Sequence, residues 1–591
     1  MRTVLLIVIL LFTFNLSAQS ERLAKDYFDK GQFEKALLSY EKLYEANKGN
    51  GNYFMKIVEI NQQLERLDVA EQMLLERIAK NGNPQYLVEL GHNYHLKEND
   101  DKAKECYEMA KVKLEERPVF AYNVASTFEK HALLDYAAEV YERAMVFRPE
   151  SNYHMQLARI YGEQGKVEKM FSSYVNFVEF NNSYINYAKR IFSEYITEDG
   201  NDPNNQLLRQ VLLKKIQSSP NVLWNEMLSW LFIQQHDYKK AFAQEKAIHK
   251  RNQELQGVLD LAYIAIDEEE SETAAEVLHY VIANSYELDV VLEAHENLVE
   301  LDIKYSENKD YEGVDAKYQA LFNEFGKQAQ TINLQLSYAH FVAFYKNQPV
   351  EASNFLKESL KNQLAKHQEA KVKMKLGDIL VFQEKFNEAL IYYSQIQKML
   401  KNSTLSQEAR FKVAKASYYK GDFDWAESQL KVLKSSTSQL IANDALDLKL
   451  LISDNKFEDS SQTALKTYAK ADLYAYQNKT DEAIELLDQV LQNHKTETIV
   501  DQALLKQAQL FEQKKQFDKA EANYLRIIAD FKEDILADDA YFALAEIYND
   551  HLGQPEKAQP LYERIIFDHA DSIYFVEARK KYRAIRGDNI N

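Results

Sequence analysis

The chain has 591 residues, of which 46% are hydrophobic and 28% are charged, so it has ample material for an extensive core. Its 72 basic and 91 acidic residues give a net charge of −19, which disfavours nucleic acid as a partner because phosphate binding needs clustered lysine and arginine. Only 15 glycines and 8 prolines occur, so we expect helices joined by short turns and almost no sheet.

The N-terminus has the features of a secretory signal. Arg2 is followed by an apolar run over residues 4–14 and then by a short polar and small-residue stretch that ends at Ala18. The run is too short to span a bilayer, so we expect a signal peptide over residues 1–18 that is cleaved after Ala18. The alternative is a buried first helix. We expect the mature chain to have no transmembrane segment, while association with the membrane periphery, or secretion, stays open.

From residue 31 onward, a pattern of small residue, aromatic residue, turn, alanine and aromatic residue recurs about every 34 residues. Its alanines are Ala36, Ala70, Ala103 and Ala137, which are 34, 33 and 34 residues apart. A single globular core does not impose such a period, whereas a stack of helix-turn-helix units does. A small residue lets two helices approach closely and an aromatic residue fills the space between neighbouring pairs, so the two kinds must alternate.

Two further segments follow the first array. The polar cluster from Thr197 to Asn205 is typical of a turn, and it lacks the ordered ligand spacing of a calcium loop. After it, helical periodicity continues with blurred repeats, and the phasing sharpens again from residue 369. We therefore expect a signal peptide at 1–18, an N-terminal repeat array at 19–197, degenerate helical repeats at 198–368, and a C-terminal array with a capping helix at 369–591.

The turn and second helix of the first unit, residues 31–36 followed by Tyr40, resemble the tetratricopeptide repeat family. The resemblance recurs at Leu376, Gly377, Phe386, Ala389 and Tyr393; at Gly421, Phe423 and Ala426; at Ala471, Tyr474 and Ala483; and at Ala508, Phe511, Phe517, Ala520 and Tyr524. It implies an all-α fold, a right-handed superhelical α-solenoid of helix-turn-helix repeats similar to those of this family.

The last units carry a variant of the repeat. Residues 530–541 and 568–579 resemble the longer-turn repeats of bacterial envelope proteins, a class that includes outer-membrane assembly lipoproteins and periplasmic cell-division coordinators. Together with the signal peptide, this resemblance implies a periplasmic location, with secretion or outer-membrane association as alternatives.

Residues that could carry catalysis are not found in a convincing arrangement. No phosphate-binding glycine loop, dinucleotide fingerprint, nucleophile elbow or His-Glu-x-x-His pair occurs in the sequence. His92 and His95 lie three residues apart on a predicted helix, but no third metal ligand is evident, because the one cysteine, Cys106, should point into the core. We therefore predict that the protein is not an enzyme and that it has no metal and no cofactor.

In tetratricopeptide arrays the first helix of each unit lines a concave groove. The resemblance implies an inner face on which Met and Tyr supply contact area and polar groups fix orientation, as suits a bound helix or extended peptide. In the first array this face comprises Asn52, Met55, Glu59, Gln62, Val88, His92, His95, Tyr122, Ser126, Glu129, Met155 and Arg159. In the C-terminal array it comprises Met374, Asp378, Val381, Phe382, Phe411, Lys415, Tyr418 and Tyr419. The alternatives are an ordinary solvated face for the first set and packing between units for the second.

These features lead to two functional hypotheses. The first is a non-catalytic periplasmic scaffold whose grooves bind peptide or helical segments of envelope proteins, for example in assembly or organisation of the envelope. The second is an envelope protein that binds carbohydrate or peptidoglycan, or an enzyme, with its site in the irregular middle segment around Trp224 and Trp230. Their six-residue spacing puts the two tryptophans on different faces of a helix, which favours core packing.

Overall fold

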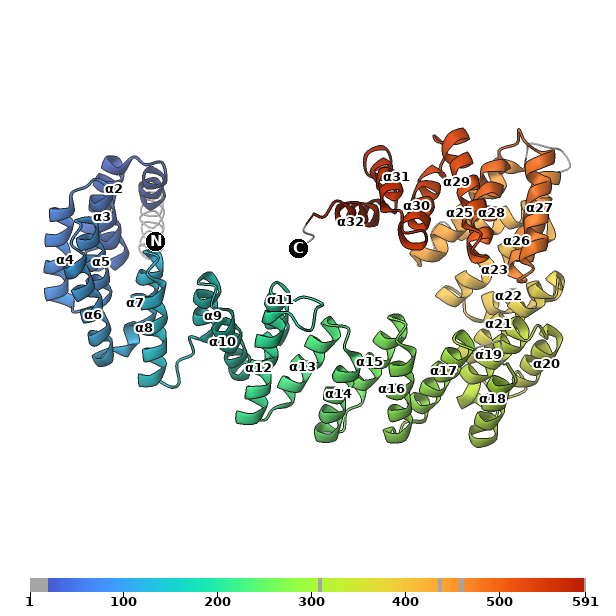
Figure 1. Ribbon diagram of the computed structural model, residues 1–591, viewed down its shortest axis with the longest axis horizontal. Helices are drawn as coiled ribbons and strands as arrows, with labels where there is room; N and C mark the ends of the chain where they lie inside the picture. The colour runs from blue at the N-terminus through green and yellow to red at the C-terminus, as the bar shows by residue number, and fades with distance from the viewer. Residues whose placement is uncertain (1–19, 307–310, 434–437, 457–461, 589–591) are drawn as a thin grey trace, which may run out of the picture. The chain divides into compact units, whose positions relative to one another are not determined.

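The computed structural model describes residues 20–306, 311–433, 438–456 and 462–588, and every regular element within these ranges is a helix. The helices follow one another as helix-turn-helix pairs (Figure 1). This arrangement confirms the prediction of an all-α solenoid of repeats for the described part of the chain. The chain divides into two compact units, residues 1–261 and 262–591, here called unit 1 and unit 2. The predicted signal peptide lies outside the described residues.

Unit 1 begins with helical residues 20–29 and continues as a row of helix pairs. Its elements are α2 (Phe33–Ala46), α3 (Gly51–Gln63), α4 (Leu67–Asn81), α5 (Gln85–Leu96), α6 (Asp100–Glu116), η1 (Pro118–Phe120), α7 (Ala121–Lys130), α8 (Leu134–Phe147), α9 (His154–Glu163), α10 (Val167–Phe180), η2 (Asn182–Tyr184), α11 (Ile185–Ser193), α12 (Pro203–Ser218), α13 (Val222–Gln234) and α14 (Tyr238–Asn252). Helix α15 (Gln256–Asp267) contains the division between the units.

Unit 2 continues the same construction. Its elements are α16 (Ser271–Asn284), α17 (Leu288–Lys304), α18 (Tyr311–Phe325), η4 (Ala329–Thr331), α19 (Ile332–His340), η5 (Phe341–Tyr345), α20 (Pro349–Ser359), α21 (Lys366–Phe382), α22 (Phe386–Met399), α23 (Thr404–Lys420), α24 (Phe423–Leu433), α25 (Gln439–Asn455), α26 (Thr463–Tyr476), α27 (Thr480–Asn493), α28 (Ile499–Gln513), α29 (Phe517–Asp530), α30 (Ala537–Glu546), η6 (Ile547–His551), α31 (Pro555–Asp568) and α32 (Phe575–Ile585). The closing helix α32 is joined to the array by Lys581, whose ammonium pairs with Asp550 at 2.8 Å.

Small residues set how closely the two helices of a pair approach. A Cβ added to Gly91 would lie 2.3 Å from Cε1 of Tyr107, and one added to Gly377 would lie 2.4 Å from Cε1 of Tyr393. The repeat alanines Ala36, Ala70, Ala103 and Ala137 are all buried. The predicted alternation of small and aromatic residues is therefore the packing rule of the helix pairs, because the ring of the second helix occupies the space that a side chain on the first would need.

The turn between the two helices of a pair is also periodic. One of its residues adopts a positive φ, and this residue is a glycine in some helix pairs, such as Gly421 with φ of 82°. In other helix pairs it carries a side chain, as at Glu98 (58°), Ala132 (57°) and Lys515 (57°). A left-handed backbone costs a residue with a side chain about 1 kcal/mol, so the packing of the helix pair imposes this turn on whatever residue stands there.

The polar cluster that begins at Thr197 forms an ordered turn. The side chain of Asp202 caps α12 by accepting hydrogen bonds from the backbone N–H groups of Asn204 and Asn205. The amide of Asn205 is 1% exposed and donates to the carbonyls of Thr197 and Asp199, at 2.7 Å each. The cluster thus holds its own shape through side-chain caps, as Asn and Asp commonly do in turns.

Helix α12, which follows this cluster, is in direct contact with α10, which precedes it in the first array. Nζ of Lys215 on α12 donates to Oδ1 of Asn176 on α10 at 2.8 Å. The division between the two compact units falls at residue 261, inside the segment predicted as degenerate repeats. The predicted segment boundaries at 197 and 368 stay predictions.

Candidate binding surfaces

The predicted inner face of unit 1 belongs to α3, α5, α7 and α9, the first helices of their pairs. Tyr122 is 55% exposed, so a large aromatic side chain is accessible on this face. Asn52, His95, Tyr122 and Arg159 are exposed; Met55, Glu59, His92, Ser126, Glu129 and Met155 are half-buried; Gln62 and Val88 are buried. The face therefore mixes accessible and partly covered groups.

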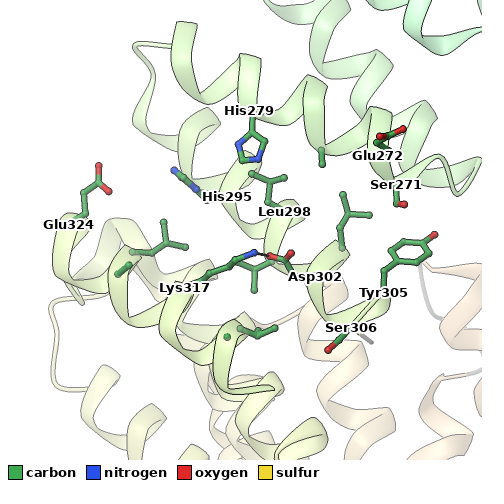
Figure 2. A pocket seen from close by; sticks show the side chains of 17 residues that line it. Ser271, Glu272, His279, His295, Leu298, Asp302, Tyr305, Ser306, Lys317 and Glu324 are labelled. Carbon is green, nitrogen blue, oxygen red and sulfur yellow. Dashed lines mark hydrogen bonds and ion pairs between the residues drawn. The ribbon is translucent and has the colours of Figure 1, made fainter. Parts of the chain in front are cut away.

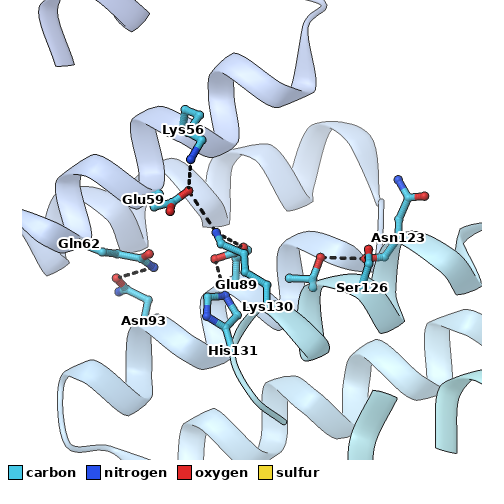
Figure 3. A network of polar contacts seen from close by, with 10 residues as sticks. Lys56, Glu59, Gln62, Glu89, Asn93, Asn123, Ser126, Lys130 and His131 are labelled. Atoms are coloured by element: carbon cyan, nitrogen blue, oxygen red, sulfur yellow. Dashed lines mark hydrogen bonds and ion pairs between the residues drawn. The ribbon is translucent and has the colours of Figure 1, made fainter. Parts of the chain in front are cut away.

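A network of charged side chains links three of these helices (Figure 3). Nζ of Lys130 lies 3.2 Å from Oε2 of Glu59 and 3.3 Å from Oε1 of Glu89. Glu59 is on α3, Glu89 on α5 and Lys130 at the end of α7, so α3 and α7 approach one another over α5. The three inner helices are therefore linked to one another across this face. Glu59 also pairs with Lys56 at 3.1 Å.

The carboxylate at the centre of this network is buried. The side chain of Glu89 is 1% exposed, and its Oε2 lies 3.1 Å from Nε2 of His131. Burial alone would raise the pKa of Glu89, but the hydrogen bond from His131 and the charge of Lys130 outweigh it and lower that pKa below its usual value. Glu89 is therefore a charged and compensated group, which fixes the relative positions of α5 and α7.

The two histidines predicted on this face have different surroundings. The ring of His92 stacks on that of His131, with 3.7 Å between the centroids, whereas His95 contacts Oδ1 of Asp100 at 2.7 Å. Burial and the neighbouring His131 lower the pKa of His92 to about 4, so His92 is neutral at physiological pH. Neither histidine belongs to a group of metal-ligating side chains among the described residues.

Glu89, Lys130 and His131 were not predicted from the sequence. Glu89 did leave a signal, since an acidic residue stands alone between the apolar Val88 and Leu90 at a position that the repeat buries. Acidic residues are almost never fully buried without a partner, so such a position indicates a nearby cation. The sequence does not indicate which cation, because Lys130 lies 41 residues away.

Glu129 and Arg159 belong to a contact that recurs along the chain. A buried tyrosine on the second helix of a pair donates to a carboxylate on the first helix, and the same carboxylate pairs with a cation of the next pair. The sets are Tyr141–Glu129–Arg159, Tyr393–Asp378–Lys412 and Tyr562–Glu546–Lys581. Each set joins two neighbouring pairs, so Glu129, Arg159 and Asp378 stabilise the stacking of the array.

The predicted inner face of the C-terminal array is packed more tightly. The ammonium of Lys415 lies 5.3 Å and 5.1 Å from the ring centroids of Tyr418 and Tyr419, so the structure brings these three predicted residues together. Tyr418, however, has no exposed surface. Met374, Val381 and Phe382 are buried, and Asp378, Phe411, Lys415 and Tyr419 are half-buried. Packing between neighbouring repeats, the alternative for this set, accounts for Tyr418.

The end of α26 covers this part of the face. The ring of Tyr476 lies 5.8 Å from that of Phe344 and 6.2 Å from those of Phe382 and Tyr419. Its hydroxyl donates to the carbonyl of Asp378 at 3.3 Å, and the amide of Gln477 donates to the carbonyl of Phe382 at 2.9 Å. The second predicted surface is thus occupied by the chain itself.

A buried carboxylate anchors α26 at this position. Asp472 is 8% exposed and lies 2.8 Å from the ammonium groups of both Lys415 and Lys506. Burial would raise the pKa of Asp472, but the two lysine charges outweigh it and lower that pKa to about 2. Asp472 is therefore ionised throughout the physiological pH range and holds α26 against α23 and α28.

A cavity of about 800 Å³ lies between α16, α17 and α18 in unit 2 (Figure 2). Leu298, Val299 and Leu321 supply its apolar lining, and Asp302 pairs with Lys317 at 2.5 Å on its wall. This cavity was not predicted from the sequence. Its lining of apolar and charged side chains can accommodate an amphipathic group.

The tryptophans of the middle segment are part of helix α13. Trp224 has no exposed surface, and its indole N–H donates to the carbonyl of Ser219 at 2.9 Å. A fully buried indole cannot stack on a sugar ring. Trp230 is half-buried.

Cys106 is a free, buried cysteine on α6, and burial raises the pKa of its thiol to about 11. Such a thiol behaves as a small apolar core residue. None of the helices in the described ranges is both long and apolar enough to cross a membrane.

Comparisons with known proteins relate part of unit 2 to a repeat family. Residues 468–535 and 539–572, which run from α26 to α31, match models of the Tetratricopeptide repeat. A comparison with curated proteins found no match.

Two solved structures illustrate the similarity to known folds. One is a chain in the crystal structure of the APC/C hetero-tetramer Cut9-Hcn1, which is 12% identical, with 96% of each chain covered and a TM-score of 0.24. The other is a chain in the structure of Naa15/Naa10 bound to HypK-THB, which is 12% identical, with 97% of this chain and 94% of that chain covered and a TM-score of 0.29. TM-scores this low support no argument about arrangement or function. The family matches and the helix pairs show that the chain contains tetratricopeptide repeats in the C-terminal part of unit 2.

Proposed function

We propose that this chain is a non-catalytic protein-interaction scaffold of the periplasm, whose inner helices hold peptide or helical segments of envelope proteins. The observation that supports this proposal is the inner face of unit 1. There Lys130, Glu59 and Glu89 link three inner helices, and the aromatic ring of Tyr122 stays accessible on the same face. Rigid aromatic surface beside fixed charges is the composition of a protein-binding groove.

The location is supported by sequence alone. Residues 1–18 have the charge, apolar run and small residues of a cleaved signal peptide, and the longer turns near the C-terminus resemble those of envelope proteins. Expression in a bacterial host followed by cell fractionation tests this part. We expect the mature chain in the periplasmic fraction with Gln19 at its N-terminus, and recovery of an uncleaved chain from the cytoplasm would refute the proposed location.

The carbohydrate-binding alternative gains no support from the middle segment, because Trp224 is fully enclosed in the core. Calorimetric titration with peptidoglycan fragments tests it independently. We expect no heat of binding above dilution. A saturable signal that is lost in a Trp230→Ala variant would favour the alternative.

Crosslinking in native cells, followed by capture of the mature chain from envelope fractions, tests the scaffold itself. The informative variant carries Tyr122→Glu and Met155→Glu, which place charges on the inner face of unit 1. A matched control carries Val112→Glu and Val146→Glu, which lie on the second helices α6 and α8 and are 56% and 76% exposed. We expect a protein partner that is retained by the control and lost by the inner-face variant. Absence of any stable partner would refute the scaffold proposal.

A further inference from the structure

Two rows of opposite charge lie on either side of α19 in unit 2. Helix α17 carries an acidic row at intervals of four, three and four residues, which places its members on one side of the helix. These members are Asp289, Glu293, Glu296 and Glu300. Helix α21 carries Lys371 and Lys375 four residues apart, and α19 packs against both α17 and α21. The acidic and basic rows therefore face one another across the width of one helix.

The charges of these rows act on one another only at a distance: Lys371 lowers the pKa of Glu296 and Lys375 that of Glu300, but less than burial raises them. Among the described residues, no ion pair involves Glu296, Glu300, Lys371 or Lys375, whereas the neighbouring Lys373 pairs with Glu369 at 2.5 Å. Glu296, Lys371 and Lys375 are nevertheless half-buried.

Their surroundings penalise the charged forms. Burial, together with the nearby Glu300 and Glu293, raises the pKa of Glu296 to about 7, and burial lowers the pKa of Lys375. Opposite charges from another molecule would stabilise both rows, because each row now lacks a counter-charge at contact distance.

A recess of about 440 Å³ separates the rows at one end. Glu296 lines one wall and Lys371 the other, and the exposed amides of Gln330 and Asn333 lie between them. The recess is large enough for side chains of a partner. It is too small for a whole helix, which is about 10 Å wide and about 1.5 Å long per residue. A segment bound here would lie over α19 and insert side chains toward both walls.

The neighbouring part of the same unit shows how inner helices hold a charged helix. On α26, Lys470 contacts Oε2 of Glu384 at 2.7 Å and Asp472 contacts Nζ of Lys415 at 2.8 Å. One helix thus presents a cation to Glu384, just after α21, and an anion to Lys415 on α23. The rows on α17 and α21 offer the same kind of contact, and no ion pair from a helix in the described ranges reaches Glu296, Glu300, Lys371 or Lys375.

We propose that the surface formed by α17, α19 and α21, here called the mixed-charge surface, binds a helical segment of a partner protein that carries Lys or Arg along one side and Asp or Glu along the other. The cations of the segment contact Glu293, Glu296 and Glu300, and its anions contact Lys371 and Lys375. This inference rests on the proposed function, because it specifies the kind of segment that the scaffold binds.

Synthetic helical peptides of about 20 residues, which span about 30 Å, test the mixed-charge surface directly. A two-sided peptide has Lys on one side and Glu on the other, and a shuffled peptide has the same composition with the charges mixed around the helix. Peptides with only Lys or only Glu complete the set. Fluorescence anisotropy of the labelled peptides with the purified chain gives the affinities. We expect the two-sided peptide to bind about tenfold more tightly than the shuffled one, with the difference reduced by salt.

Charge-reversal variants locate the binding on this surface. Lys371→Glu with Lys375→Glu makes both rows acidic, and the preference should change to the Lys-only peptide. Glu296→Lys with Glu300→Lys makes both rows basic, and the preference should change to the Glu-only peptide. The control matched to the lysine reversals, Lys398→Glu with Lys401→Glu, makes the same change in net charge as Lys371→Glu with Lys375→Glu at exposed positions on and after α22, and it should keep the wild-type preference.

The outcomes separate this inference from the proposed function. Equal binding of the two-sided and shuffled peptides, or preferences that do not follow the reversals, would overturn the inference. A Lys371→Gln, Lys375→Gln variant, checked for folding by circular dichroism, decides the case if a reversal variant does not fold: it should bind the two-sided peptide about tenfold more weakly. A free amino acid that bound with the same affinity as the peptides would also overturn the inference, because a helical segment would then not be required. If cellular partners are still crosslinked while the peptide preference is absent, the scaffold proposal stands and only this inference fails.

Discussion

The inner faces of unit 1 and unit 2 each hold a buried carboxylate between two basic side chains, but the two carboxylates have different places in their units. In unit 1, Glu89 lies within the row of inner helices, where Lys130 and His131 hold it, and Tyr122 stays accessible. In unit 2, Asp472 lies on α26, the helix whose end covers the face formed by α21 and α23. The same device fixes an open face in one unit and closes a face in the other.

This difference shows that a repeat match does not by itself identify a free groove. In both units the helix pairs follow the same packing rule, with a small residue against an aromatic ring. What differs is a set of contacts between inner helices that are not in the same pair. The predictions below test first what the units share, then what separates them.

The largest effect is expected from side chains placed where the helices of a pair meet. Gly91→Val in unit 1 and Gly377→Val in unit 2 should each lower the free energy of unfolding by about 3 kcal/mol, because even a Cβ would overlap the facing tyrosine ring. Urea denaturation measures the change. Gly49→Val is the control, since its Cβ would meet only Oδ1 of Asn47, at 3.5 Å. A clear loss at one site and none at the other would show that the packing rule is not common to both units.

Removal of the two buried carboxylates, one at a time, should have different consequences in unit 1 and unit 2. Glu89→Ala and Asp472→Ala should each cost about 2 kcal/mol of stability, because each leaves basic side chains without their hydrogen-bond acceptor. Only Asp472→Ala should also release the end of α26. Hydrogen exchange, followed by mass spectrometry, should show faster exchange over residues 470–480 in that variant, and Glu89→Ala should leave these residues unchanged. Unchanged exchange in Asp472→Ala would contradict the role given to Asp472.

How much of this was predictable from the sequence follows from the range of the contacts. The helix pairs were predictable, because Gly377 and Tyr393 meet across a single turn and recur with a fixed period. The covered face was not, because the hydroxyl of Tyr476 bonds to a carbonyl 98 residues away. Such contacts depend on small rotations added from one pair to the next, which leave no periodic signal in the sequence. For the same reason Tyr418 was placed on a surface although the structure buries it.

The free energy of unfolding in acid should also depend on the charge of Asp472, with a smaller effect than its removal. Its pKa is lowered from 3.8 to about 2 in the folded chain, so its contribution is present above pH 3.8 and is lost as the pH falls toward 2. The loss should amount to between about 1 and 2 kcal/mol. Asp501 on α28 should change stability with pH in the opposite direction, because burial raises its pKa to about 6.

The contribution of Asp501 is present below pH 3.8 and is lost as the pH rises through about 6. Thermal unfolding between pH 2 and pH 7 should therefore show a gain on acidification from pH 7 to about pH 5, followed by a loss below pH 4. Asp501→Asn should reduce the gain, to which Glu296 with its raised pKa also contributes, and Asp472→Asn should reduce the loss, to which Glu89 with its lowered pKa also contributes. A profile that falls monotonically from pH 7 in the wild type would contradict the environment given to Asp501.

The smallest expected effect concerns the turns with positive φ. Ala132→Gly in unit 1 and Lys515→Gly in unit 2 should each stabilise the chain by about 0.5 kcal/mol, because the relief of a left-handed backbone exceeds the added entropy of the unfolded glycine. The reverse change, Gly421→Ala, should destabilise it by about 1 kcal/mol. Urea midpoints measure all three. Gains of equal size in unit 1 and unit 2 would mean that the helix pair imposes the same turn in both units. The difference between the open and the covered face would then arise only from contacts between helix pairs. A loss at Ala132 or Lys515 would mean instead that the side chain at the turn contributes contacts of its own.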